Sequence, residues 1–213
     1  MNAHEPSAPG DTGEARIDRL LAPWSRPGPP ATAAGAAVVL VLRGAGDAVE
    51  TLLLERAIRA QDPASGQIGL PGGHVDPADG TLEATALREL EEEVGLPGRA
   101  LRRPVRFVAV EDAPRFGLTV GVFAAALDGE GGPAFRPDPR EVASLFWLPD
   151  RALETVGTVV RETPLGPRAV EGVTFDRHIV WGFTLKVLRR FFAGNGPRGS
   201  GPSSPNGSGQ GTP

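Results

Sequence analysis

The segment between Thr81 and Gly95 restricts the fold of this chain more than any other part of its sequence. It reads TLEATALRELEEEVG and combines helix-favouring residues with a polar residue at its start and a glycine at its end. Threonine is a residue type that caps a helix N-terminus, and glycine readily adopts the left-handed conformation that ends a helix. We therefore expect a helix over residues 81–94 that Gly95 terminates.

Three glutamates of this expected helix share one face. At about 100° per residue, Glu92 lies about 60° to one side of Glu89, and Glu93 lies about 40° to the other side. Glu91 points away from this face, toward solvent. Like charges four residues apart cost roughly 0.2–0.5 kcal/mol per pair. Carboxylates in the last turn also oppose the helix macrodipole, at about 0.3–1 kcal/mol each.

A divalent cation held by these carboxylates would reverse the sign of both costs. Hard cations such as Mg²⁺ bind through a few carboxylates together with substrate phosphates. A bare run of glutamates is more often a solvated surface. Here the run follows the glycine turn of Leu70-Pro71-Gly72-Gly73 and ends at Gly95. This context favours a metal site over an ordinary acidic surface.

Strand-like segments surround the glutamate helix on both sides. Two apolar, β-branched runs at residues 36–43 and 49–56 flank the turn-like GAGD at residues 44–47, which predicts a hairpin. Further strands are expected at residues 67–70, 105–110, 118–126 and 144–148, and further helices at residues 15–24 and 178–192. No internal repeat is visible, so one mixed α/β domain is the simplest arrangement.

The two ends of the chain differ from this body in composition. Residues 194–213 hold almost no side chain that can be buried, so ordering them would cost backbone entropy without return. The first 15 residues are similar. We expect an N-terminal tail with a short helix and a Pro/Ala linker over residues 1–34, a single domain over residues 35–193 and a disordered tail over residues 194–213.

The composition excludes several kinds of site and partner. The absence of cysteine rules out disulfides, thiol nucleophiles and thiolate zinc sites. The formal net charge of -4 argues against broad binding to nucleic acid or to an anionic membrane, since both require a basic surface. No apolar run approaches the roughly 20 residues that span a bilayer, and residues 1–13 lack the order of a secretory signal. We expect a cytoplasmic protein that binds neither nucleic acid nor membrane.

The glutamate helix resembles the signature of the Nudix hydrolases. That signature runs Gly, five residues, Glu, seven residues, and then Arg-Glu-apolar-x-Glu-Glu-x-Gly-apolar. Its second half is met by Arg88, Glu89, Leu90, Glu92, Glu93, Gly95 and Leu96. In the first half the loop is one residue longer, and Asp79 stands in for the usual glutamate.

The resemblance implies an α+β fold, built as a three-layer α/β/α sandwich around a mixed β-sheet. It also implies hydrolysis of a nucleoside diphosphate joined to another group, with Glu89, Glu92 and Glu93 holding Mg²⁺ or Mn²⁺. Arg88 would orient a glutamate through an ion pair. The base that takes the proton of the attacking water could be Glu89, Glu141 or another distal glutamate. The sequence does not choose between them.

Segments outside the helix narrow the resemblance to the coenzyme A pyrophosphatase branch. Residues 66–73, GQIGLPGG, are close to that branch's Gly-Gln-Val-Ala-Phe-Pro-Gly-Gly, and residues 53–57 match its Leu-Leu-x-x-Arg-Ser/Ala start. Residues 179–184, IVWGFT, are similar to its Ile-Trp-Gly-x-Thr segment. The Arg-x-His pair that usually precedes the Gly-Gln is absent. The implied partner is a small-molecule nucleotide, coenzyme A or an acyl derivative, with ADP-ribose and NADH as alternatives.

A non-catalytic nucleotide-binding regulatory module is the alternative from another class. Its usual mark would be damage to the glutamates of the helix, and all three are intact. Many relatives are dimers, and no sequence feature decides whether this chain forms a homodimer.

Several residues outside the helix are candidates for substrate binding. Gly72 and Gly73 would let the backbone approach the helix without a Cβ clash, and Arg56 would neutralise a substrate phosphate. Trp181 is expected to be a core residue. For Glu111, a second candidate distal acid, the alternative is a place in a surface loop, as it is for Glu141.

Overall fold

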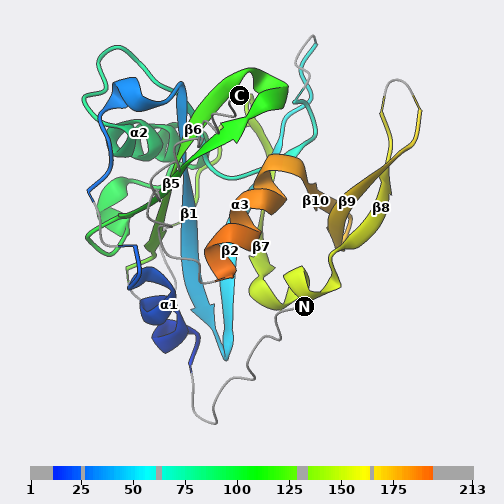
Figure 1. The fold of residues 1–213 in the computed structure, drawn as a ribbon, viewed down its shortest axis with the longest axis horizontal. Coiled ribbons are helices and arrows are strands. Elements are labelled where there is room, and N and C mark those ends of the chain that lie inside the picture. Colours follow the sequence, from blue (N-terminus) through cyan, green and yellow to red (C-terminus); the bar gives the residue numbers. More distant parts are fainter. Residues whose placement is uncertain (1–11, 25–26, 61–63, 129–133, 164–165, 194–213) are drawn as a thin grey trace, which may run out of the picture.

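The computed structural model describes residues 12–24, 27–60, 64–128, 134–163 and 166–193 (Figure 1). Residues 1–11 of the predicted N-terminal tail and the whole predicted tail at residues 194–213 lie outside the described residues. The helices are α1 (Gly13–Leu21), α2 (Leu82–Val94) and α3 (Gly182–Phe192), with short 3-10 helices η1 (Ala31–Ala33), η2 (Gly98–Ala100), η3 (Pro114–Phe116) and η4 (Asp150–Thr155). The strands are β1 (Ala36–Ala45), β2 (Ala48–Arg56), β3 (Ile68–Gly69), β4 (Gly72–His74), β5 (Arg106–Ala113), β6 (Leu118–Ala126), β7 (Val142–Pro149), β8 (Gly157–Arg161), β9 (Arg168–Phe175) and β10 (His178–Trp181).

A mixed sheet of seven strands forms the centre of the molecule. Its main order is β3-β2-β1-β6-β5, while β4 pairs with β1 and β7 pairs with β2. The hairpin of β1 and β2 is confirmed as an antiparallel pair. Only the pairing of β1 with β6 is parallel among the pairs of this sheet in the described chain. The expected mixed sheet is therefore confirmed.

Strand β1 is buried on both faces, and its alternating side chains define the two outer layers. Leu40 and Leu42 belong to the core cluster that also contains apolar residues of α1 and α3. Val39 and Val41 belong to the cluster that contains apolar residues of α2. Because successive side chains of a strand point to opposite faces, α2 covers one face of the sheet and α1 and α3 cover the other (Figure 1). The expected three-layer α+β sandwich is confirmed.

The segment before the linker contributes to this core. Ile17 of α1 is fully buried, and the Trp24 ring stacks on Phe191 of α3 with 6.3 Å between ring centroids. The short helix expected at residues 15–24 is therefore confirmed, although it begins at Gly13. A domain boundary at residue 35 stays a prediction.

The helix expected over residues 178–192 begins four residues too early. His178–Trp181 is strand β10, which pairs with β9, and β9 pairs with β8 in a second antiparallel sheet. The apolar residues of β10 run into those of α3, and a short apolar run does not distinguish a strand from a helix. Gly182, with φ of 60°, separates the two elements. Strands β8 and β9 were not predicted, and Figure 1 shows their hairpin projecting from the body of the molecule.

Candidate active site

Helix α2 begins and ends where its capping residues predict. The Thr81 hydroxyl accepts a hydrogen bond from the Ala84 backbone N–H at 3.1 Å. Gly95 has a φ of 68°, and its N–H donates to the carbonyl of Glu91 at 3.0 Å. The apolar side of the helix packs on the sheet through buried residues that include Leu82 and Leu90. Its polar edge then faces the loop that carries β4.

The three glutamates on this edge differ in burial. The Glu93 side chain is 3% exposed and that of Glu89 is 15% exposed, whereas that of Glu92 is 58% exposed. The three carboxylates on the shared face therefore differ in their contact with solvent. That of Glu93 lies inside the protein, that of Glu89 lies at its surface boundary and that of Glu92 lies in solvent.

Strand β4 closes over the two more buried carboxylates through its glycines. The Gly72 N–H donates to Glu93 Oε2 at 2.9 Å. A Cβ on Gly73 would lie 2.5 Å from the Glu89 carboxyl group. A Cβ on Gly72, whose φ is 146°, would instead lie 2.2 Å from the carbonyl oxygen of Ala37 in β1. Only Gly73 thus permits the close approach to the helix that was expected of both glycines, and Gly72 permits the pairing of β4 with β1.

Arg88 connects this edge of α2 to the preceding loop. Its guanidinium donates to Glu89 at 2.8 Å and to Glu92 at 2.9 Å. It also donates to Asp79 at 3.0 Å and to the backbone carbonyl of His74 at 3.0 Å. Hydrogen bonds from Arg88 are the largest cause that lowers the pKa of Asp79, to about 2. Asp79 therefore acts on the glutamates through Arg88.

Burial raises the pKa of both inner glutamates. Burial is the largest cause for Glu93, whose pKa rises to about 7, and the negative charges of Glu89 and Glu141 add to the rise. The Gly72 N–H and Arg56, whose guanidinium lies 3.8 Å from Glu93 Oε1, oppose it. Burial is also the first cause of the raised pKa of Glu89, where Arg88 opposes and Glu92 and Glu141 contribute.

The predicted distal acid Glu141 lies within electrostatic range of this cluster. It immediately precedes β7, is half-exposed, and forms an ion pair with Arg59 at 2.9 Å. Its charge raises the pKa of Glu89 and of Glu93. The fold therefore brings Glu141 close to the helix glutamates from a distant part of the sequence.

The carboxylates suit a hard divalent cation in their chemistry. In the part of the chain that the structure describes, no three His, Asp or Glu side chains gather closely enough to form a ready-made metal site. Arg88 engages oxygens of Glu89 and Glu92. Mg²⁺ requires only one or two carboxylates when waters and substrate phosphates complete its shell. The repulsion between Glu89 and Glu93 gives these residues a physical reason to accept a cation.

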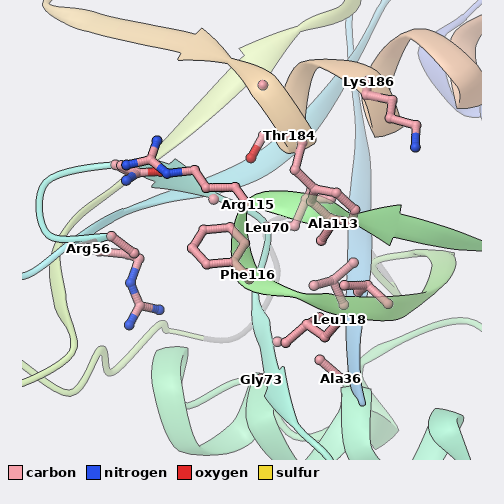
Figure 2. A pocket seen from close by; sticks show the side chains of 18 of the residues that line it. Ala36, Arg56, Leu70, Gly73, Ala113, Arg115, Phe116, Leu118, Thr184 and Lys186 are labelled. Atoms are coloured by element: carbon pink, nitrogen blue, oxygen red, sulfur yellow. The ribbon is translucent and has the colours of Figure 1, made fainter. Parts of the chain in front are cut away.

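A cavity of about 670 Å³ opens beside β4, which carries Gly72 and Gly73 and is called the glycine strand below (Figure 2). Arg56, at the end of β2, and Lys186, of α3, lie on opposite sides of it in the close-up, and Arg115 and Phe116 reach in from η3. Most of the wall is apolar. Trp181 is part of the wall and is half-buried, so the expectation that it is a core residue was wrong.

Some of these positions had no signal in the sequence. Arg115 and Phe116 follow β5 in a short turn, and no motif marks them. The other acid considered, Glu111, lies in β5 with 5% of its surface exposed and pairs with Lys186 and Arg190, each at 2.7 Å. Glu111 therefore lies neither in a surface loop nor next to the glutamates of α2.

Among the described residues no helix is long and apolar enough to cross a membrane.

Comparison with known proteins identifies the family. The family model described as the NUDIX domain matches residues 32–163. A protein of Yersinia enterocolitica named "Uncharacterized Nudix hydrolase NudL" is 31% identical over 145 residues, which cover 66% of this chain and 71% of that protein. The protein of the same name in Salmonella paratyphi B is 32% identical over 146 residues, covering 65% of this chain and 71% of the relative.

Solved structures share the fold. The NUDIX domain of Shewanella oneidensis NrtR, crystallised with ADP ribose, superposes with a TM-score of 0.51 at 17% identity, covering 74% of this chain and 85% of that one. A NUDIX hydrolase of Alicyclobacillus acidocaldarius has the same TM-score at 19% identity, covering 74% and 90%. The fold, the family match and the relatives lead to one conclusion: this chain belongs to the Nudix hydrolase family.

Proposed function

We propose that this Nudix hydrolase cleaves the diphosphate linkage of coenzyme A or an acyl derivative, giving 3′,5′-ADP and the corresponding 4′-phosphopantetheine. One observation carries the proposal. The two segments that resemble coenzyme A pyrophosphatases, residues 66–73 and 179–184, both line the cavity beside the helix glutamates. Pocket residues outside the catalytic helix decide the selectivity of such an enzyme.

The shape and lining of the cavity agree with a substrate of this kind. Its volume of about 670 Å³ lies within the range of small-molecule sites. Its apolar wall includes Leu118, Phe116 and Phe183, which would contact the largely uncharged pantetheine arm. Arg56 stands where the glycine strand and Glu93 meet the cavity, so it would neutralise one phosphate of the diphosphate.

The residues of the site would divide the catalytic work between them. Glu89, Glu92 and Glu93 would hold Mg²⁺ or Mn²⁺, which when bound would neutralise diphosphate charge and lower the pKa of water. Arg88, fixed by Asp79, orients the Glu89 carboxylate. Either Glu89 or Glu141 would take the proton of the attacking water. The raised pKa of Glu89 suits a proton acceptor. No covalent intermediate with the protein is required.

A substrate panel tests this proposal. Coenzyme A, acetyl-coenzyme A, NADH, ADP-ribose and diadenosine polyphosphates would be compared at equal concentration with Mg²⁺ or Mn²⁺, and ranked by kcat/KM. We expect coenzyme A or its acetyl derivative to rank first. If ADP-ribose or NADH exceeds coenzyme A by tenfold, the coenzyme A assignment is wrong and only the broader activity on diphosphates stands. If nothing is cleaved, the non-catalytic alternative holds.

A further inference from the structure

The loop that precedes β7 crosses the C-terminal end of α2. The Arg136 N–H donates to the carbonyl of Val94 at 2.9 Å, and the Asp138 N–H donates to that of Glu93 at 2.9 Å. The last carbonyls of a helix have no partner within the helix, so this loop supplies partners for two of them. Gly95 permits the crossing, because a Cβ at this position would lie 2.8 Å from the backbone oxygen of Arg136.

The loop then makes a tight turn that begins at Asp138 and ends at Glu141. The Asp138 carbonyl accepts hydrogen bonds from the N–H groups of Glu141 at 2.9 Å and of Val142 at 2.8 Å. The Asp138 carboxylate accepts the N–H of Arg140 at 2.9 Å. Aspartate at the first position of such a turn and a proline at the second, here Pro139, are both preferred. Asp138 thus closes the turn with its backbone and with its side chain.

Asp138 therefore connects two parts of the site that lie far apart in the sequence. Its N–H holds the backbone of Glu93, and its carbonyl holds that of Glu141. The Ala57 N–H, just beyond β2, donates to the Glu141 carbonyl at 2.8 Å and fixes the same segment to the end of that strand. Burial is the largest cause of the raised pKa of Glu89 and of Glu93, and the charge of Glu141 adds to both. The turn thus places Glu141 within electrostatic range of the helix glutamates.

The Glu141 carboxylate is held through the same turn. Its Oε1 forms an ion pair with Arg59 at 2.9 Å. The Arg59 guanidinium donates through Nε to the Arg140 carbonyl at 2.7 Å. The N–H of Arg140 is the one that the Asp138 carboxylate accepts. The turn therefore orients the backbone of Glu141 directly and its carboxylate through Arg59.

The ion pair between Asp138 and Arg140 is a separate contact from the turn. The Arg140 side chain is 86% exposed, and its guanidinium lies 2.6 Å from the Asp138 carboxylate. Exposed ion pairs contribute about 0–1 kcal/mol to stability. The turn itself needs one side-chain oxygen at position 138, which asparagine also carries. Substitutions at this position can therefore separate the turn from the charge.

We infer that Asp138 is a positioning residue for hydrolysis: by closing the turn against the end of α2, it holds Glu141 at the edge where Glu89 and Glu93 lie. The inference rests on the proposed function in one respect, because it gives Glu141 a part in the reaction. It applies to whichever diphosphate is the substrate. Asp138 lies outside the lining of the cavity, so it acts through Glu141.

A double-mutant cycle on Asp138 and Glu141 tests this role. The substrate is the compound of the panel that the unmodified enzyme cleaves fastest, with Mg²⁺ present. We expect Asp138→Ala and Glu141→Gln each to lower kcat by about tenfold or more, with KM changed by less than about threefold. In the Glu141→Gln background, Asp138→Ala should lower kcat by less than about twofold, because the carboxylate that Asp138 positions is already gone.

Two further substitutions at position 138 separate the geometry of the turn from its charge. Asp138→Asn keeps the oxygen that accepts the Arg140 N–H and should retain about half or more of the unmodified kcat. Asp138→Glu keeps the charge but places the oxygens one carbon farther from the backbone, so it should lower kcat as Asp138→Ala does. Asp138→Glu replaces the alanine variant in the cycle if that variant does not fold.

Asp18→Ala is the matched control. It removes an exposed carboxylate that also pairs with an arginine, Arg102 at 3.2 Å, and it lies in α1 on the other face of the sheet. It should leave kcat and KM unchanged within about twofold.

Hydrogen exchange measures the turn independently of turnover. The N–H groups of Arg140, Glu141 and Val142 all donate to Asp138. Their exchange should be about tenfold faster or more in Asp138→Ala and close to the unmodified rate in Asp138→Asn. Glu141→Gln should change these rates by less than about threefold, because the N–H groups keep their acceptors.

The outcomes separate this inference from the proposed function. With an active unmodified enzyme, each of four results would overturn the inference: equal factors for Asp138→Ala in the two backgrounds, full kcat in Glu141→Gln, an asparagine variant as impaired as the alanine variant, or exchange rates that Asp138→Ala leaves unchanged. Cleavage of ADP-ribose or NADH in place of coenzyme A would refute the coenzyme A assignment and leave the cycle to be interpreted in the same way. An unmodified protein that cleaves no compound would refute both.

Discussion

Two glutamates are buried to a similar degree on opposite sides of the central sheet, and their surroundings differ. Glu111 is 5% exposed and lies 2.7 Å from the side-chain nitrogens of both Lys186 and Arg190. Glu93 is 2% exposed and has one backbone N–H at 2.9 Å. The guanidinium of Arg56 lies farther from it, at 3.8 Å, and other carboxylates are nearby.

This difference separates a structural carboxylate from one that is prepared for a ligand. A buried charge is costly unless it is paired and hydrogen-bonded. Two cations from α3 offset that cost for Glu111, and the pairs join α3 to β5. The compensation of Glu93 is incomplete, so its pKa rises to about 7. Proteins commonly accept such a local cost at functional sites.

The largest expected effect is on turnover. Glu93→Gln keeps the shape of the side chain and removes the negative charge that we propose to bind the divalent cation. We expect kcat to fall at least a hundredfold, equivalent to about 2.7 kcal/mol of transition-state stabilisation, while the variant stays folded by circular dichroism. Glu92→Gln should act in the same direction. Undiminished hydrolysis by Glu93→Gln and Glu92→Gln, or by enzyme treated with EDTA, would contradict a role of these carboxylates in metal binding. Glu93 would then differ from Glu111 in its surroundings but not in its function.

The next effect is on the pH dependence of stability without metal. The pKa of Glu93 in the folded state is about 7, above the ordinary value of 4.5 for a glutamate. The folded state therefore holds more protons than the unfolded state between these values. The stabilisation is complete below about pH 4.5 and is lost as the pH rises through 7.

In EDTA, we expect the free energy of unfolding to fall by about 1–3 kcal/mol more between pH 5 and pH 8 in the unmodified protein than in Glu93→Gln. Urea denaturation across this range measures the difference. The raised pKa of Glu89 contributes in the same direction and remains in the variant. If the free energy of unfolding depends on pH in the same way in both proteins, the buried charge of Glu93 is offset by its surroundings as fully as that of Glu111.

Glu111→Gln should produce the opposite pattern. It leaves two cations without their shared carboxylate, but both are partly exposed and can reach water, so we expect a loss of about 2 kcal/mol in the free energy of unfolding. The kcat of the folded variant should stay within twofold. Glu171→Gln is the matched control, because it breaks an exposed pair with Arg189 of the same helix and should cost less than about 1 kcal/mol.

A large effect of Glu111→Gln on kcat, with little effect on stability, would reverse the roles of the two residues. A loss of stability as small as that of Glu171→Gln would show that burial adds nothing to the ion pairs of Glu111.

The sequence predicts the glutamate helix well because its determinants are local. Thr81 and Gly95 set its ends, and the helical repeat alone places Glu89 and Glu93 on one face. Their unequal burial depends on β4, whose glycines close over them in the folded chain. That closure is a tertiary effect, which a helical repeat does not describe.

The distal parts of the site show where sequence reasoning fails. Glu141 was the first candidate distal acid in the sequence and Glu111 the second, and the ion pairs that join Glu111 to α3 show what the sequence could not, that Glu111 supports the packing of α3 on β5. The run from His178 to Trp181 fitted a helix as well as a strand, so the second sheet was missed. Because the second sheet was missed, the contacts of the Trp181 ring with Arg115 and Arg161 were missed too. These two arginines come from separate elements, η3 and β8, and share no sequence pattern.

The smallest expected effect is the stabilisation of the folded protein by Mg²⁺. A ligand that binds only the folded state adds RT ln(1 + [L]/Kd), which is about 1.4 kcal/mol at ten times the dissociation constant. Thermal unfolding at increasing Mg²⁺ concentration should show a rise in Tm for the unmodified protein and an equal rise for Glu111→Gln from its lower starting value. Glu93→Gln should show little or none, because the carboxylate that we propose to bind the ion has lost its charge. Equal shifts in all three proteins would place the ion away from Glu93, and the incomplete compensation of that residue would then need a cause other than metal binding.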